Sequence, residues 1–275
     1  MQYLRSHSIR TVALALPLLA FSAPASAQLG DLLNAVKEKV EQEVERPVQG
    51  AQDGQAQTRS VQGEGSSRLR INEGFNFTPG RTVLVHDEFS DTAIGAMPHS
   101  WKTNGSGAVV SVDGLEGQWL SLQSFATYKL ETPPQLPESF TIEFDVVLAA
   151  DSSRDVGGMP FGFTADNSVR SYVQDAYNDA GITVVNLNPQ GSSTASSSAT
   201  EYYHSFDFDY KPYANRVMHV SIAVDGNAMQ VYLDRAKVAD AQLFRDNPAK
   251  YFFISAPINL DNGANVLFGN FRIGS

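Results

Sequence analysis

The sequence predicts an all-β sandwich of two antiparallel sheets, because three features recur from residue 75 to residue 275. Apolar and polar residues alternate in short runs, as they do in strands that bury one face. Turn residues separate these runs at intervals of about ten residues, a spacing typical of sandwiches. No run in this range has the three- and four-residue apolar spacing of a long helix. We therefore predict one β-domain over 75–275, preceded by a short helix and a flexible linker.

The bulk composition narrows the classes of partner. The chain has 275 residues, a formal net charge of −10 and no cysteine. An acidic surface repels phosphate backbones, so we expect no nucleic-acid partner. The lack of cysteine excludes disulfides, cysteine metal sites and attachment to lipid through a cysteine.

Residues 1–27 have the pattern of a signal peptide. Arg5 and Arg10 make a basic start, an apolar run follows over 12–21, and Ala25-Ser26-Ala27 is a small-residue cleavage site. The apolar run is too short to span a bilayer. We expect an exported protein, periplasmic, in the outer envelope or secreted, with no membrane span after cleavage.

The mature chain is predicted to begin with an amphipathic helix over 28–46, which ends before Pro47. Its apolar stripe consists of Leu29, Leu32, Leu33, Val36, Val40 and Val44. A helix this short is marginal alone in water, so the stripe either packs on the domain or docks a protein partner. Residues 47–74 are rich in Gln, Gly, Ser and Arg and are predicted to be a disordered linker.

The predicted strands follow in order. They are 82–86, 108–112, 119–122, 127–130, 139–148, 160–165, 172–173, 181–187, 201–213, 217–224, 229–233, 251–254 and 266–273. Asp113-Gly114 and Asp225-Gly226-Asn227 are hairpin turns. The serine-rich run 191–200 is predicted to be a mobile loop, and Trp101 and Trp119 to be core residues.

The strand 139–148 has the clearest pattern. Phe140, Ile142 and Phe144 share one face with two further apolar residues. Glu143 and Asp145 share the other face, roughly 7 Å apart along the strand. This pair of carboxylates raises the question of catalysis.

Four segments together resemble the concanavalin A-like, laminin-G-like jelly-roll domains. They are Asp87-Glu88-Phe89 with Gly95, Pro98 and Trp101, the run 136–145, the hairpin 217–234, and Gly269-Asn270-Phe271-Arg272-Ile273. The chain most resembles bacterial envelope proteins that carry such a domain after a charged helical leader. The resemblance implies a jelly roll over 75–275. That fold hosts lectins, hydrolases, lyases and adhesion modules, so function must be argued from a site.

Laminarinase-type hydrolases of this fold use a strand motif E-x-D-x-(x)-E, in which the first Glu is the nucleophile and the last is the acid/base. Glu143 and Asp145 match the first two positions, but Val147 or Leu148 stands at the third. Retaining hydrolysis needs both glutamates. A lyase would need a His/Tyr base, for which His204 with Tyr202, Tyr203 or Tyr210 is the candidate. We expect packing roles for this histidine and for His86, His99 and His219.

A sugar site needs exposed aromatic faces with carboxylates or amides. The candidates are Tyr202, Tyr203, His204, Asp207, Asp209 and Tyr213, the loop residues Asp175 and Asp179 with Asp166, Asn167, Tyr177 and Asn178, and the strand pair Glu143 and Asp145. Asp207 with Asp209, or Asp175 with Asp179, are candidates for Ca²⁺. No other cofactor is expected.

These patterns favour non-catalytic recognition of an envelope or extracellular polysaccharide. The alternative is a structural or interaction module that docks through the helical stripe of residues 29–44. A polysaccharide hydrolase or lyase is the third hypothesis.

Overall fold

The computed structural model describes residues 75–275, which fold into fifteen strands and two short 3-10 turns. The signal peptide, helix and linker expected over 1–27, 28–46 and 47–74 lie outside the described residues. The strands are β1 (Val83–Asp87), β2 (Trp101–Thr103), β3 (Gly107–Val112), β4 (Leu115–Leu122), β5 (Thr127–Leu130), β6 (Ser139–Ala149), β7 (Met159–Thr164), β8 (Gly181–Leu187), β9 (Ser193–Ser197), β10 (Tyr202–Phe206), β11 (Val217–Asp225), β12 (Ala228–Leu233), β13 (Ala236–Gln242), β14 (Tyr251–Ser255) and β15 (Asn265–Gly274).

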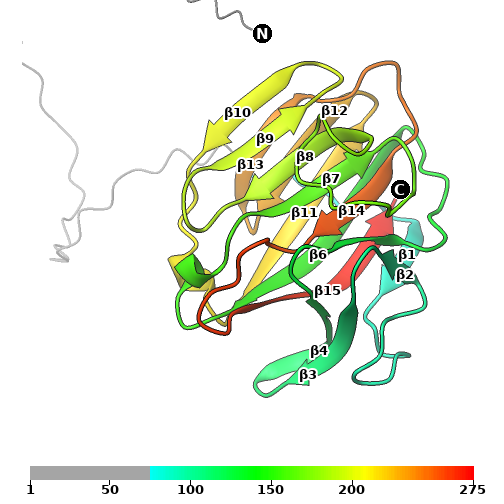
Figure 1. The fold of residues 1–275 in the computed structure, drawn as a ribbon. Coiled ribbons are helices and arrows are strands. Elements are labelled where there is room, and N and C mark those ends of the chain that lie inside the picture. Colours follow the sequence, from blue (N-terminus) through cyan, green and yellow to red (C-terminus); the bar gives the residue numbers. More distant parts are fainter. Residues whose placement is uncertain (1–74) are drawn as a thin grey trace, which may run out of the picture. The chain divides into compact units, whose positions relative to one another are not determined.

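The strands form two antiparallel sheets that pack face to face (Figure 1). Sheet A has the order β13-β12-β11-β6-β15-β4-β3, with β1 also paired to β15. Sheet B has the order β10-β9-β8-β7-β14-β5-β2. In each sheet a late strand, β15 or β14, lies between strands from the early and middle parts of the chain. This nested order is that of the concanavalin A-like jelly roll, and it confirms the predicted fold.

The core lies between the sheets and is organised around β6. Alternation turns Phe140, Ile142, Phe144, Val146 and Leu148 inward, and all five are buried. The ring of Phe144 meets rings from both sheets, with centroids 5.3 Å from Phe161, 5.6 Å from Phe252 and 5.5 Å from Phe268. Aromatic rings at these separations add to the free energy gained from burial.

Two predictions over residues 191–213 are wrong. The expected mobile loop over 191–200 contains β9, whose serines are buried rather than solvated. Ser193 Oγ bonds Tyr210 Oη at 2.7 Å, and Ser197 Oγ donates to the Leu243 carbonyl at 2.6 Å. The expected strand over 201–213 is only β10, so Asp207 and Asp209 follow the strand and share no strand face.

The sequence pattern also missed β2 and β13, and residues 172–173 form no strand. Trp101 lies in the main core as predicted. Trp119 is buried elsewhere, on the outer face of sheet A with Val147 and Leu267. Gly269 lies directly under its ring, where a Cβ atom would come within 2.9 Å. Residues 75–275 contain no helix with the length and apolar character that crossing a membrane requires.

We expect Phe144→Ala to lower the free energy of unfolding by about 3–5 kcal/mol, because it removes a buried ring and leaves a cavity between the sheets. Urea denaturation followed by tryptophan fluorescence measures this change. Val217→Ala is the control, since Val217 is 40% exposed and should change stability by less than about 0.5 kcal/mol. An equal effect of the two substitutions would contradict the assignment of Phe144 to the centre of the core.

Candidate functional site

The connection between β7 and β8 is the most unusual loop of the described chain. These strands are antiparallel neighbours, yet residues 165–180 lie between them. Hairpin connections commonly take about 2–5 residues, and much longer ordered loops are usually functional. We call this segment the 165–180 loop.

The 165–180 loop is fixed to the outer face of sheet B. Val173 N donates to Thr127 Oγ1 at 2.8 Å, and Ser255 Oγ donates to the Val173 carbonyl at 2.8 Å. Tyr172 Oη donates to the Ala256 carbonyl at 2.8 Å. Val173 and Ala176 are buried with Val184 and Phe253 of the sheet. The loop is therefore a rigid platform for its exposed side chains.

A buried lysine from β5 anchors the start of this loop. Lys129 has no exposed surface, and its Nζ donates to Thr164 Oγ1 at 2.8 Å and to the Asp166 carbonyl at 3.0 Å. Burial lowers the pKa of Lys129 to about 8, and the Asp166 carboxylate partly offsets this effect. The ammonium thus ties β5 to the stretch where β7 ends and the loop begins.

Phe125 extends from the chain beside this platform. Its side chain is 59% exposed, and its backbone has φ of 62°, a left-handed conformation that disfavours residues with a Cβ atom. The ring stacks on Tyr172 with centroids 4.8 Å apart and planes 9° apart. Tyr172 thus covers one face of the ring, and the exposed fraction leaves apolar surface in contact with solvent.

Two adjoining hollows share Tyr172 and Gln174, and we call them together the aromatic–amide groove. The first, of about 540 Å³, is lined by Asn104, Phe125, Arg170, Ser171, Tyr172, Gln174, Asn178 and Asp179. The second, of about 230 Å³, is lined by Gly157, Gly158, Pro160, Tyr172, Gln174, Asn186, Asn188, Gln190, Ile258 and Asn259. An aromatic face thus lies next to a hollow rich in amides.

One amide of the second hollow is unsatisfied. Asn186 Oδ1 is buried and accepts no hydrogen bond within the described chain. A Cβ atom on Gly158 would come within 2.7 Å of this oxygen, so the glycine makes room for the Asn186 amide itself. Buried polar atoms normally find a partner, so this amide has unused hydrogen-bonding capacity at the wall of the hollow. Stacking surface and amides are the groups that recognise sugars.

The carboxylates of β6 are committed to an ionic network on the outer face of sheet A. His219 of β11 lies opposite Asp145, with Nδ1 2.6 Å from Asp145 Oδ1 and Nε2 3.6 Å from Glu143 Oε1. From β15, Arg272 Nη1 donates to Glu143 Oε2 at 2.9 Å, and Asn270 Nδ2 donates to Asp145 Oδ2 at 3.0 Å. Each carboxylate therefore has two partners.

This network has clear electrostatic consequences. Hydrogen bonding to Asp145 and then to Glu143 raises the pKa of His219 to about 9. The same imidazole lowers the pKa of the Glu143 carboxyl. At the third position of the hydrolase motif, Val147 is 1% exposed in the cluster with Trp119. The strand face therefore has a buried apolar side chain where that motif has an acid/base carboxylate, and ion-paired carboxylates at the first two positions.

The aromatic candidates around β10 do not form one site. Tyr203 is 69% exposed, whereas the ring of His204 lies between Tyr202 and Phe206, 6.4 Å from each. Tyr213 Oη donates to Asp234 Oδ2 at 2.5 Å.

The four acidic candidates for calcium are engaged separately. Asp207 accepts from Ser192 Oγ at 2.9 Å, and Asp209 accepts from the Lys211 amide at 3.1 Å. Asp175 accepts from the backbone amides of 177 and 178, and Asp179 accepts from Ser171 Oγ. Within residues 75–275, no three carboxylate or imidazole side chains converge as a metal site requires.

Sequence reasoning missed Phe125, and the packing role expected for His219 is wrong, because its imidazole pairs with Asp145 and Glu143. Phe125 lies in a segment of four residues between two predicted strands. A large apolar residue is unusual in such a turn, and this feature could have marked Phe125 as a candidate from the sequence alone. His219 occupies an outward position in the alternation of 217–224. Only the pairing of β11 with β6 places it beside Glu143 and Asp145.

No protein-family model matches this chain, and no curated protein matches it. Solved structures do resemble it. A carbohydrate-binding module, CBM66, from Bacillus subtilis is 15% identical, with 64% of this chain and 96% of that chain covered and a TM-score of 0.42. Arcelin-5, a lectin-like defence protein from Phaseolus vulgaris, is 13% identical, with coverages of 69% and 96% and a TM-score of 0.48. The carbohydrate recognition domain of Emp47p is 14% identical, with coverages of 69% and 93% and a TM-score of 0.46.

The His219 network predicts a loss of stability at alkaline pH. A histidine whose pKa is higher in the folded than in the unfolded protein stabilises the fold. This contribution is present in full at pH values below the unfolded pKa of about 6.5. This stability disappears as the pH rises through the folded value of about 9. Because the His219 side chain is 37% exposed, we expect only on the order of 1 kcal/mol.

Urea denaturation between pH 6 and pH 10 measures this contribution. His219→Gln should remove the fall in stability that the imidazole causes in that range, whereas the exposed control His99→Gln should retain it. The lowered pKa of Lys129, about 8, contributes a slope of the opposite sign that all three chains share. An unaltered slope in His219→Gln would show that the imidazole gains no proton affinity on folding.

Proposed function

We propose that this chain is an exported, non-catalytic recognition module that binds polysaccharide in the aromatic–amide groove. The observation that carries the proposal is the exposed position of the Phe125 ring. An apolar ring is exposed to solvent on a disfavoured backbone conformation, stacked on a tyrosine and next to a hollow lined by amides. Residues held in sparsely populated conformations concentrate at ligand sites, because there the function compensates the cost.

The groove favours a neutral stretch of sugar, because most of its lining is uncharged and its two charged residues, Arg170 and Asp179, have opposite signs. One face of a pyranose ring is lined by C–H groups and can lie on the Phe125 ring. The hydroxyls around its edge pair with Gln174, Asn186 and Asn188, which supply donors and acceptors on the same side chain. The two hollows adjoin, so the groove suits consecutive units of a linear chain.

The support for a non-catalytic role comes from the charged groups. Glu143 and Asp145 each pair with two partners, and Val147 occupies the position of the missing glutamate. The groove itself has Asp179 as its acidic lining residue, and Ser171 donates to that carboxylate. A pair of free carboxylates, which glycoside hydrolysis needs, is not among the lining residues of the groove.

We expect Phe125→Gly to weaken binding to polysaccharide at least tenfold, because it removes the stacking surface. Stability should change little, because two effects offset each other. Glycine adopts the left-handed backbone without the cost of roughly 1–2 kcal/mol that phenylalanine bears there, but the contact between the Phe125 and Tyr172 rings is lost. Affinity gel electrophoresis against a panel of neutral β-glucans, mannans and xylans measures binding, and urea denaturation measures stability.

Tyr203→Ala is the matched control, because Tyr203 is an exposed aromatic residue of β10 outside the groove. It should bind like the unaltered chain. Equal binding by Phe125→Gly and the unaltered chain would overturn the groove, and no binding to any of these polymers by the unaltered chain would overturn neutral-polysaccharide recognition.

Export is tested separately by the amino terminus of the protein made in a bacterial host. Cleavage after Ala27 should leave Gln28 as the first residue, which intact-mass measurement of the periplasmic or secreted fraction detects. Ala25→Arg should block cleavage and raise the mass by that of the retained leader. An unprocessed chain in the cytosolic fraction would contradict export.

A further inference from the structure

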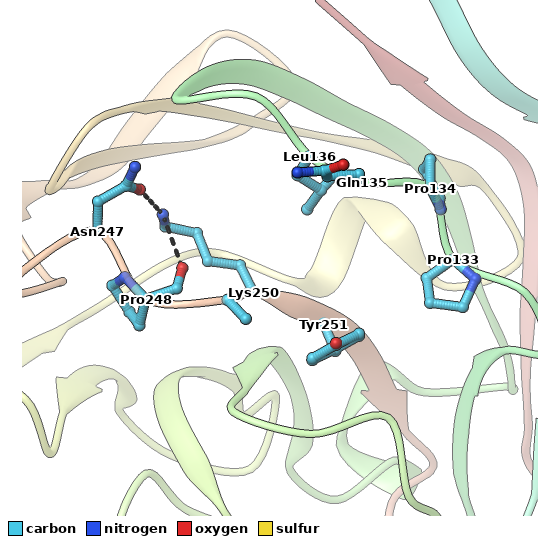
Figure 2. A pocket seen from close by; sticks show the side chains of 9 residues that line it. Pro133, Pro134, Gln135, Leu136, Asn247, Pro248, Lys250 and Tyr251 are labelled. Carbon is cyan, nitrogen blue, oxygen red and sulfur yellow. Dashed lines mark hydrogen bonds between the residues drawn. The ribbon is translucent and has the colours of Figure 1, made fainter.

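A third hollow lies apart from the groove, between the segment before β6 and the start of β14. We call it the proline cleft, and its volume is about 580 Å³. It is lined by Pro133, Pro134, Gln135, Leu136, Asn247, Pro248, Ala249, Lys250 and Tyr251. Figure 2 shows Asn247, Pro248 and Lys250 on one side of the space and Pro133, Pro134 and Leu136 on the other. Its size falls within the range of roughly 300–1,000 Å³ that small ligands occupy.

Lys250 is the residue that indicates which kind of ligand this cleft could bind. Only 7% of its surface is exposed, although lysine is seldom buried without a charged partner. Its Nζ donates to Asn247 Oδ1 at 2.5 Å and to the Pro248 carbonyl at 3.3 Å, and it lies 4.8 Å from the centre of the Phe244 ring. All three partners are neutral.

The charge of Lys250 is not balanced by contact with an acid. No carboxylate of residues 75–275 lies within 4.0 Å of its Nζ. Glu138 attracts it from farther away, yet loss of hydration still lowers the pKa of Lys250. An ammonium has three N–H donors and two are used here, so one remains for a further acceptor.

A carboxylate bound in the cleft would complete this environment. A buried charge is costly until it is paired, and a partner of opposite sign recovers much of that cost. Gln135 and Asn247 supply amides for hydroxyls, and the proline rings and Tyr251 supply apolar surface. An acidic sugar has this combination of one carboxylate, several hydroxyls and C–H faces.

We propose that the proline cleft binds a single uronate unit of a polysaccharide, with Lys250 as the partner of its carboxylate. The net charge of −10 repels long polyanions, so an isolated uronate on a mostly neutral chain suits this surface better than a polyuronate. The site is independent of the aromatic–amide groove and shares none of its lining residues.

Isothermal titration calorimetry of the full chain tests the proposal. The probe is a xylo-oligosaccharide that carries one glucuronate, compared with the same oligosaccharide after reduction of its carboxyl group. We expect the acidic form to bind at least tenfold more tightly, and Lys250→Met to abolish this difference. Lys211→Met, an exposed lysine, is the control and should preserve it.

A second variant keeps the test decisive if Lys250→Met does not fold. Glu138→Gln removes the carboxylate that competes for Lys250, so it should tighten binding of the acidic probe about two- to threefold and leave the reduced probe unchanged. Equal affinity for the two probes in the unaltered chain, or no change in Glu138→Gln, overturns the proposal. Phe125→Gly should leave the difference between the probes intact, which separates failure of the cleft from failure of the groove.

Discussion

The alternation of β6 is the constraint on which the rest of the structure depends. One face must be apolar, because β6 lies at the centre of sheet A and Phe144 meets aromatic rings from both sheets. The other face carries Glu143 and Asp145 over the outside of the same sheet. Carboxylates at the centre of a sheet need partners from both neighbouring strands. β11 supplies His219 and β15 supplies Arg272 and Asn270, so the network also fixes the register of three strands.

The outer face of sheet B is used differently. The 165–180 loop covers it and is held by side chains of β5 and β14, namely Lys129, Thr127 and Ser255. A loop fixed in this way loses little conformational entropy when a ligand binds. The rigid loop and the strained backbone at Phe125 together place the stacking ring beside the amides. Here the fold provides a platform, and the loop provides the candidate site.

The sequence was a reliable guide wherever period-two alternation coincided with burial. β5 and β8 begin and end at the predicted residues, and β6, β11 and β12 differ by a residue or two. The pattern failed where polar side chains are buried, as in β9, whose serine hydroxyls are satisfied by Tyr210 and by the Leu243 carbonyl. The pairing of strands that are distant in the sequence could not be predicted either. Whether Glu143 is a free acid or an ion-paired one depends on His219 of β11 and Arg272 of β15, which lie 76 and 129 residues further along the chain (219 − 143 = 76).

Net charge and local charge lead to different conclusions about ligands. A net charge of −10 acts over the Debye length of about 8 Å at physiological ionic strength and disfavours the approach of extended polyanions. Inside a hollow, the few groups in contact decide what binds. The aromatic–amide groove presents amides and an aromatic ring, whereas the proline cleft presents one desolvated ammonium. A polymer that is mostly neutral and carries occasional carboxylates satisfies both conditions, because its overall charge is small enough to approach and its single charges match the cleft.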